Sequence, residues 1–122
     1  MINIKNIILF NCRETIEEFS HEVIHVWRRL MRALGESLGI SSLEQTFGEL
    51  DMSLAMNYYP VCPQPDLTLG LSSHSDVGGI TILLQDENVP GLQVKTPIDT
   101  WMTVQPIKNA LLINLGDQLE VH

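Results

Sequence analysis

Apolar residues between positions 13 and 38 recur every three or four places, the spacing that gathers side chains on one face of an α-helix. These positions are Ile16, Phe19, Val23, Trp27, Leu30, Leu34 and Leu38. The pattern predicts an amphipathic helix over 13–38 whose apolar face packs into a core, and binding of a partner is the alternative use of that face. Ser41 and Glu44 have the spacing of a capping box, which predicts a second, short helix from Ser41 to about Phe47.

From Asp51 onward, the pattern changes to short runs of β-branched and apolar residues separated by proline and glycine. The runs predict strands near 52–59, 67–73, 79–85, 91–95, 101–105 and 110–115. Helices followed by several short strands indicate an α+β chain whose larger part is a β-sandwich or barrel. We expect Gly78-Gly79 to form a turn, with close approach of a bound molecule as the alternative, and Gly116-Asp117 to form a turn and not a catalytic carboxylate. Trp101 is expected to lie in the core, and a platform for a bound molecule is the alternative.

The composition is acidic, with 15 Asp and Glu against 7 Lys and Arg, so the formal net charge is −8. This balance argues against nucleic acid or an anionic membrane as a partner, because both attract basic surfaces. The two cysteines, Cys12 and Cys62, are too few for a disulfide scaffold and are expected to be reduced thiols. No apolar stretch approaches the roughly 20 residues of a membrane-spanning helix. A cytoplasmic protein of 122 residues, about one small domain, is the expectation.

His74-Ser75-Asp76 is the strongest chemical signal in the chain. Alternate side chains of an extended segment point to the same side, so an imidazole nitrogen and a carboxylate oxygen can meet at one point there. Such donors suit a divalent first-row metal, and with a second histidine they make the facial triad of non-haem Fe(II) oxygenases. A capped surface turn is the alternative reading. Asn57 and Tyr59 share one face of the predicted strand 52–59 and are candidates to bind a small organic acid, unless they only end that strand.

Several ordered blocks surround these residues. MNYYPVCPQPDLTLGLSSHSD is followed by GGITILLQDENVPGLQV, then by a tryptophan, and then by NALLINLGDQLEV. Over residues 51–121 this order resembles the plant 2-oxoglutarate- and Fe(II)-dependent dioxygenases, and most of all the group with jasmonate-induced oxygenases and flavanone- or flavonol-type hydroxylases. The resemblance implies a double-stranded β-helix, or jelly roll, with helices outside. The expected segments are an atypical N-terminal extension (1–12), a helical segment (13–50) that packs on the sheet, and a partial jelly roll (51–122).

The resemblance also implies the chemistry. His74 and Asp76 match two Fe(II) ligands of the family, and Asn57 and Tyr59 match positions that contact 2-oxoglutarate. With O₂, such an enzyme decarboxylates 2-oxoglutarate to succinate and hydroxylates or desaturates a small molecule. The family's second histidine ligand is expected just beyond the last residue, and its Arg-x-Ser motif further on, together with the final strands. The sequence is therefore expected to be a piece truncated at both ends, with little or no activity.

Other readings of the same residues stay open. His122 is a candidate replacement for the missing ligand, which would make a structural metal site with His74 and Asp76. His21 and His25 lie four apart, a spacing that can bind metal on a helix, although a solvated pair is the expectation. A jelly-roll module that binds or interacts without catalysis is the main functional alternative. The substrate and the oligomeric state are not specified by any motif.

Overall fold

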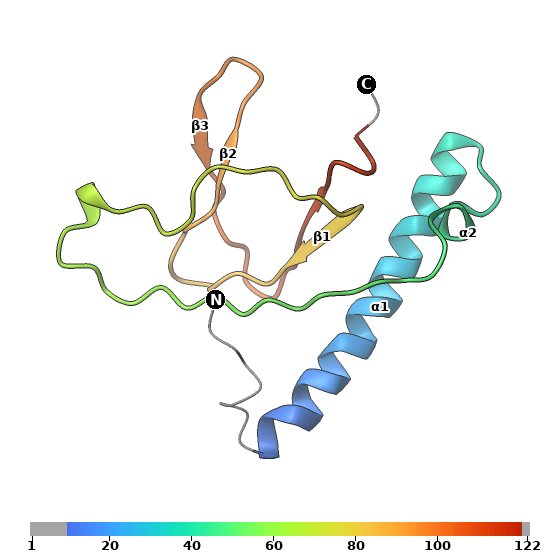
Figure 1. Ribbon diagram of the computed structural model, residues 1–122, viewed down its shortest axis with the longest axis horizontal. Coiled ribbons are helices and arrows are strands. Elements are labelled where there is room, and N and C mark those ends of the chain that lie inside the picture. Colours follow the sequence, from blue (N-terminus) through green and yellow to red (C-terminus); the bar gives the residue numbers. More distant parts are fainter. Residues whose placement is uncertain (1–9, 121–122) are drawn as a thin grey trace. The chain divides into compact units, whose positions relative to one another are not determined.

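The computed structural model describes residues 10–120. The described chain divides into two compact units, one ending at Val61 and the other beginning at Cys62. The first unit holds two helices, α1 (Phe10–Leu38) and α2 (Leu43–Phe47) (Figure 1). The second unit holds a short 3₁₀ turn, η2 (Pro65–Leu67), and the strands β1 (Ile80–Leu83), β2 (Gln93–Lys95), β3 (Trp101–Thr103) and β4 (Leu112–Leu115).

Helix α1 confirms the helix predicted from the apolar periodicity and begins three residues earlier than expected. Most of its apolar stripe is half-buried, and only Leu38 at the end is exposed. The buried hydrophobic side chains of the described chain are Met31 on α1 and Leu43 on α2, which are 2% and 6% exposed. Gly35 lies beside them, where a Cβ atom would come within 2.9 Å of the Ile40 carbonyl oxygen. Glycine at this position therefore lets the chain after α1 fold back closely against it.

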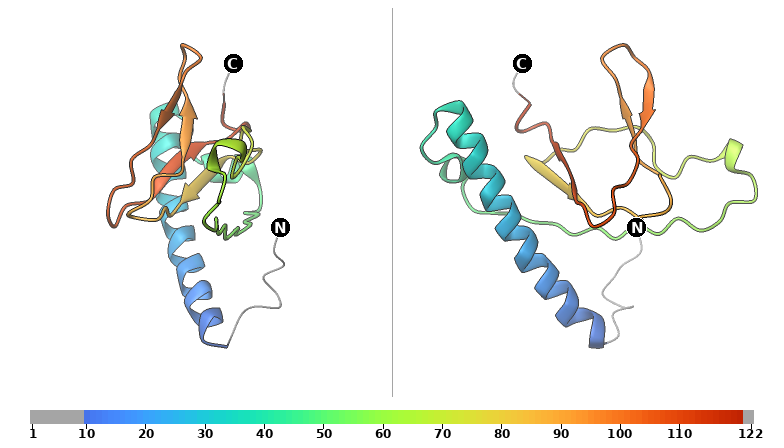
Figure 2. Two further views of the ribbon diagram at one scale, coloured as in Figure 1. Left: turned by 90° about the vertical axis from the view of Figure 1, so that its left-hand side faces the viewer. Right: turned by 180° about the vertical axis from the view of Figure 1, so that it is seen from behind.

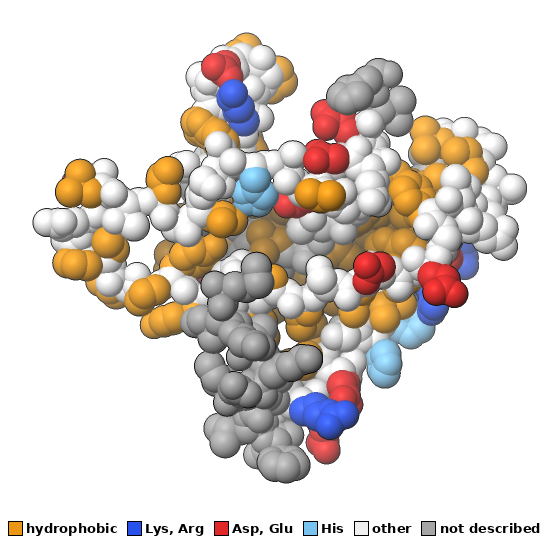
Figure 3. Space-filling model, viewed as in Figure 1, with side chains coloured by type: hydrophobic (Ala, Val, Ile, Leu, Met, Phe, Trp, Pro, Cys, Tyr) orange, Lys and Arg blue, Asp and Glu red, His pale blue; other side chains and the backbone are white. Residues whose placement is uncertain are grey.

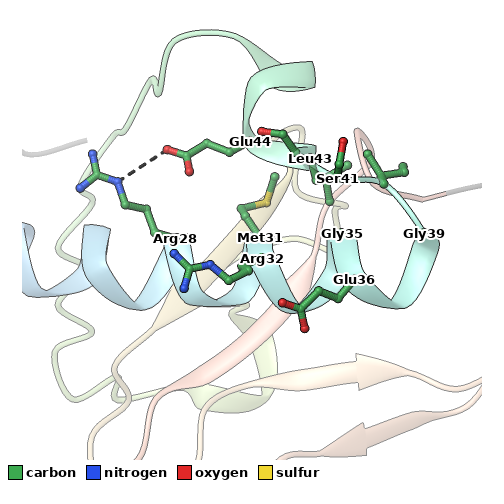
Figure 4. Close-up of a pocket in the computed structure, with 11 residues that line it drawn as sticks. Arg28, Met31, Arg32, Gly35, Glu36, Gly39, Ser41, Leu43 and Glu44 are labelled. Atoms are coloured by element: carbon green, nitrogen blue, oxygen red, sulfur yellow. Dashed lines mark ion pairs between the residues drawn. The ribbon is translucent and has the colours of Figure 1, made fainter.

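The corner between α1 and α2 is held by packing more than by a cap (Figure 4). Ser42, not Ser41, precedes α2, and its side chain makes no capping hydrogen bond, so the predicted capping box is wrong. Burial of Leu43 next to α1 accounts for where the helix begins. An exposed ion pair joins Arg28 Nε to Glu44 Oε1 at 3.6 Å across an open hollow. None of the sequence-predicted site residues lines that hollow.

Two antiparallel strand pairs make up the regular part of the second unit, and Figure 2 shows both pairs. β1 pairs with β4, with Ile80 opposite Leu115 and Leu83 opposite Leu112. β2 and β3 form a hairpin in which Lys95 lies opposite Trp101. Four predicted strands are thereby confirmed, each shorter than expected. The described strands form two separate two-stranded sheets and no closed barrel, so the predicted jelly roll is present only in part.

The two earliest predicted strands are wrong. Residues 52–59 and 67–73 contain no strand, because a strand needs a hydrogen-bonded neighbour and no described segment pairs with either of them. Their apolar side chains are accordingly exposed, and hydrophobic groups are visible on the surface in Figure 3. Trp101 is a further correction: it is 51% exposed and not part of a core. Trp101 lies on the two-stranded hairpin of β2 and β3, and no described element buries its side chain.

Candidate metal centre

His74 lies in the irregular segment that leads into β1, and its ring orientation is set by a backbone contact. Its Nδ1 is 2.8 Å from the carbonyl oxygen of Ser72. A carbonyl oxygen can only accept a hydrogen bond, so this contact assigns the proton to Nδ1. The lone pair of the neutral ring is then on Nε2, and this is the arrangement in which metal-binding histidines are typically held.

Asp76 lies two residues further on, and one of its two carboxylate oxygens is fully engaged. Thr81 Oγ1 donates to Oδ2 at 2.5 Å, and Asn114 Nδ2 donates to the same oxygen at 2.8 Å. Thr81 and Asn114 are direct partners in the register of β1 and β4. Because residues opposite each other in an antiparallel pair point to the same face, both donors reach the carboxylate together.

These two hydrogen bonds also set the electrostatics of Asp76. The Thr81 hydroxyl, and next the Asn114 amide, stabilise the carboxylate and hold the pKa of Asp76 below its usual value. Partial burial opposes this shift, and the nearby His74 ring adds to it. The side chain of Asp76 is therefore favoured in the ionised form, which is the form that binds a cation.

The turn after β4 is hydrogen-bonded to the segment that holds Ser75 and Asp76. The Asp117 amide donates to the Asp76 carbonyl oxygen at 2.7 Å, and Ser75 Oγ donates to Asp117 Oδ2 at 3.0 Å. A Cβ atom on Gly116 would stand 2.6 Å from the Asp76 carbonyl oxygen and closer still to that of Gly78, so only glycine fits. The predicted turn at Gly116-Asp117 is confirmed, and the Asp117 carboxylate is used to bind Ser75.

Comparison with known proteins gives the context for this centre. Residues 50–122, more than half of the chain, match the family model of the 2OG-Fe(II) oxygenase superfamily. The chain belongs to this superfamily. It is 53% identical over 114 residues to jasmonate-induced oxygenase 4 of Arabidopsis thaliana, covering 89% of this chain and 32% of that protein. This result confirms the resemblance on which the sequence-based expectations were built.

The chain is also similar to two further proteins. Thebaine 6-O-demethylase of Papaver somniferum is 44% identical over 89% of this chain and 31% of its own length. Flavanone 3-dioxygenase 2 of Oryza sativa subsp. japonica is 44% identical over 88% of this chain and 32% of its own length. The chain thus spans about a third of the length of these curated relatives.

Members of the 2OG-Fe(II) oxygenase superfamily use Fe(II), 2-oxoglutarate and O₂, and the geometry of His74 and Asp76 fits two of the iron ligands. The unengaged atoms, His74 Nε2 and Asp76 Oδ1, are 3.5 Å apart. Two donors that each lie about 2.1 Å from one ion are at most about 4.2 Å apart, so both can bind the same ion. The two side chains are 51% and 30% exposed, which leaves them accessible. Within residues 10–120, no third His, Cys, Asp or Glu joins them.

The remaining histidines add nothing further to this centre. His122 lies outside the described residues, so its proposed role as a third ligand stays a prediction. His21 and His25 are both exposed on α1, as expected for a solvated pair, and no described group of three ligand side chains includes them.

No helix of the described chain is long and apolar enough to cross a membrane.

The predicted 2-oxoglutarate contacts lie in the other unit. Asn57 and Tyr59 are exposed residues in the irregular segment that follows α2, not on the strand that the sequence predicted. They belong to the unit that ends at Val61, whereas His74 and Asp76 belong to the unit that begins at Cys62. Their role in binding 2-oxoglutarate stays a prediction.

The sequence-based prediction missed Thr81 and Asn114. A signal for both was present, since each is the polar residue inside an otherwise apolar strand, Ile-Thr-Ile-Leu in β1 and Leu-Ile-Asn-Leu in β4. A polar side chain in such a run is expected to have a specific hydrogen-bond partner. The identity of that partner was not readable, because it depends on the strand register.

Proposed function

We propose that this chain supplies part of the active site of a 2-oxoglutarate- and Fe(II)-dependent dioxygenase that hydroxylates or desaturates a small organic molecule. The observation that carries the proposal is the pair of unengaged donor atoms, His74 Nε2 and Asp76 Oδ1, 3.5 Å apart. Each residue's second polar atom is already bound, to the Ser72 carbonyl oxygen and to the donors from β1 and β4, respectively. The two unengaged atoms are therefore the ones that a shared cation would contact.

The residues of this chain have separate tasks in the proposed reaction. His74 and Asp76 would hold the iron, which when bound supplies the oxidative chemistry with O₂. Asn57 and Tyr59 would orient 2-oxoglutarate through their amide and hydroxyl groups. The names of the relatives refer to thebaine, a flavanone and jasmonate, and the proposed substrate class is a plant specialised metabolite or hormone. The cytoplasmic location expected from the reduced cysteines stays a prediction, as does the exclusion of nucleic-acid partners.

A titration with Mn(II), followed by electron paramagnetic resonance of the free ion, tests the metal site in the purified chain. Mn(II) replaces Fe(II) as the probe because it is stable in air and prefers similar ligands. We expect binding that is lost in His74→Ala and in Asp76→Ala. The matched control is His25→Ala, an exposed histidine on α1 whose loss should leave binding unchanged. If the chain binds no Mn(II), the non-catalytic interaction module becomes the better interpretation.

A second titration tests the co-substrate contacts. Calorimetry of 2-oxoglutarate binding to the Mn(II)-loaded chain should show weaker binding for Asn57→Ala and for Tyr59→Phe, which removes only the hydroxyl group. Tyr58→Phe provides the matched control, since Tyr58 is the neighbouring exposed tyrosine and has no assigned role. Equal affinities for both tyrosine variants would remove Tyr59 from the proposed site and leave the metal ligands unaffected.

A further inference from the structure

Thr81 and Asn114, one residue from each strand of the β1–β4 pair, share a single hydrogen-bond acceptor. They are opposite each other in the register of β1 and β4, yet they point their donors at a single oxygen atom of a third residue, Asp76 Oδ2. The hydroxyl and the amide lie 2.5 Å and 2.8 Å from that oxygen. Asp76 itself is outside both strands, five residues before Thr81 and 38 residues before Asn114.

We propose that Thr81 and Asn114 are positioning residues that restrict Asp76 to binding a metal through Oδ1 alone. The proposal rests on the proposed function, because it assigns a task within the same metal site. A carboxylate with two free oxygens can rotate, and it can bind a cation through one oxygen or both. With Oδ2 occupied by two donors, only Oδ1 is free, and that is the oxygen directed toward His74 Nε2.

The strand pair is well suited to this task because its geometry is fixed by backbone hydrogen bonds. Side chains opposite each other in an antiparallel pair have Cβ atoms about 4.5–5.5 Å apart, so one acceptor placed between them can be reached from both sides. Hydrogen bonds to the free atoms of metal-binding side chains typically contribute about 10–100-fold to metal affinity. The direction of the Asp76 ligand is therefore set by residues that do not touch the metal.

The test compares Mn(II) affinity in the full chain and in variants of the two donors, by electron paramagnetic resonance of free Mn(II). Thr81→Val and Asn114→Leu each remove the donor at similar volume, and each should weaken binding about 10–100-fold. Thr81→Ser keeps the hydroxyl and should restore most of the affinity. Thr103→Val is the matched control, because Thr103 lies in β3 of the other strand pair and should leave Mn(II) affinity unchanged.

The spectrum of bound Mn(II) separates positioning from general support of the fold. At saturating Mn(II), Thr81→Val should change that spectrum, because the freed Asp76 Oδ2 can then also bind the ion, and Thr103→Val should leave it unchanged. Far-ultraviolet circular dichroism checks folding, and Asn114→Ala, which removes the donor without adding a charge, replaces any variant that fails to fold. Wild-type affinity in Thr81→Val and Asn114→Leu would overturn this inference alone. Absence of Mn(II) binding by the wild-type chain would overturn the proposed function and this inference with it.

Discussion

Asp76 shows how a single side chain acquires its properties from residues that are distant in sequence. The spacing of His74 and Asp76 is local, so the sequence was sufficient to identify both as candidate ligands. The hydrogen bonds to the Asp76 carboxylate depend on Thr81 and Asn114, and Asn114 is 38 positions away. Only the pairing of two strands brings Asn114 to Asp76, so the sequence could suggest the candidate ligand but not the hydrogen bonds that orient it.

The lowered pKa of Asp76 predicts a pH dependence of stability with a definite sign. A carboxyl group whose pKa is lower in the folded state stabilises the fold above its unfolded pKa, and this contribution is lost as the pH falls through the folded value. Nuclear magnetic resonance titration should place the Asp76 midpoint below 3.8, its ordinary value. Thr81→Val should raise that midpoint because it removes the largest cause of the shift. An unchanged midpoint in this variant would contradict the assigned cause.

At the scale of elements, the sequence predicted helices and strands well where local pattern decides. Helix α1 and the four strands β1 to β4 follow from apolar periodicity and the positions of glycine and proline. The segments 52–59 and 67–73 show the same strand-forming pattern and yet remain irregular. Strand structure depends on a hydrogen-bonded neighbour as well as on composition, and one segment alone does not reveal whether that neighbour is present.

Gly116 provides a test of how closely the turn after β4 approaches the backbone segment that precedes β1. Alanine at this position would press a methyl group against the backbone at Asp76 and Gly78, where no flexible side chain can yield. We expect Gly116→Ala to lower the free energy of unfolding by about 1–3 kcal/mol, as measured by urea denaturation. Gly91→Ala is the control, since nothing lies within 4 Å of its added Cβ. A change of less than about 0.5 kcal/mol in both variants would show that the turn after β4 adjusts freely.

At the scale of the whole molecule, much of the apolar side-chain surface is exposed. Val61 is 98% exposed and Leu69 80%, and both lie in irregular segments without a pairing strand among the described residues. Exposed apolar side chains of this kind favour association and aggregation. The sequence pattern predicted strands of a β-sandwich or barrel, whose apolar face would be covered. It did not predict that so many of these apolar side chains would be exposed.

We therefore expect replacement of apolar residues in the segment 67–71 to improve the behaviour of the chain in solution. Leu67, Leu69 and Leu71 are all exposed, so the triple change to serine removes apolar surface at little cost in packing. Light scattering after size-exclusion chromatography should show less association than for wild type at equal concentration. The control is Leu43→Ser, which replaces a buried residue on α2 and should increase association. An unchanged distribution in the triple variant would show that other surfaces cause the association.

The distance in sequence between Asp76 and Asn114 also has a consequence for the order of events during synthesis. Asp76 leaves the ribosome 38 residues ahead of the amide that fixes it. At about 5–20 residues per second, that interval lasts roughly 2–8 s. During this time the carboxylate lacks one of its two donors, and only Thr81, five residues later, is close in sequence to restrict it. We therefore expect the proposed metal site to reach its final geometry only after β4 has emerged, late in translation of this segment.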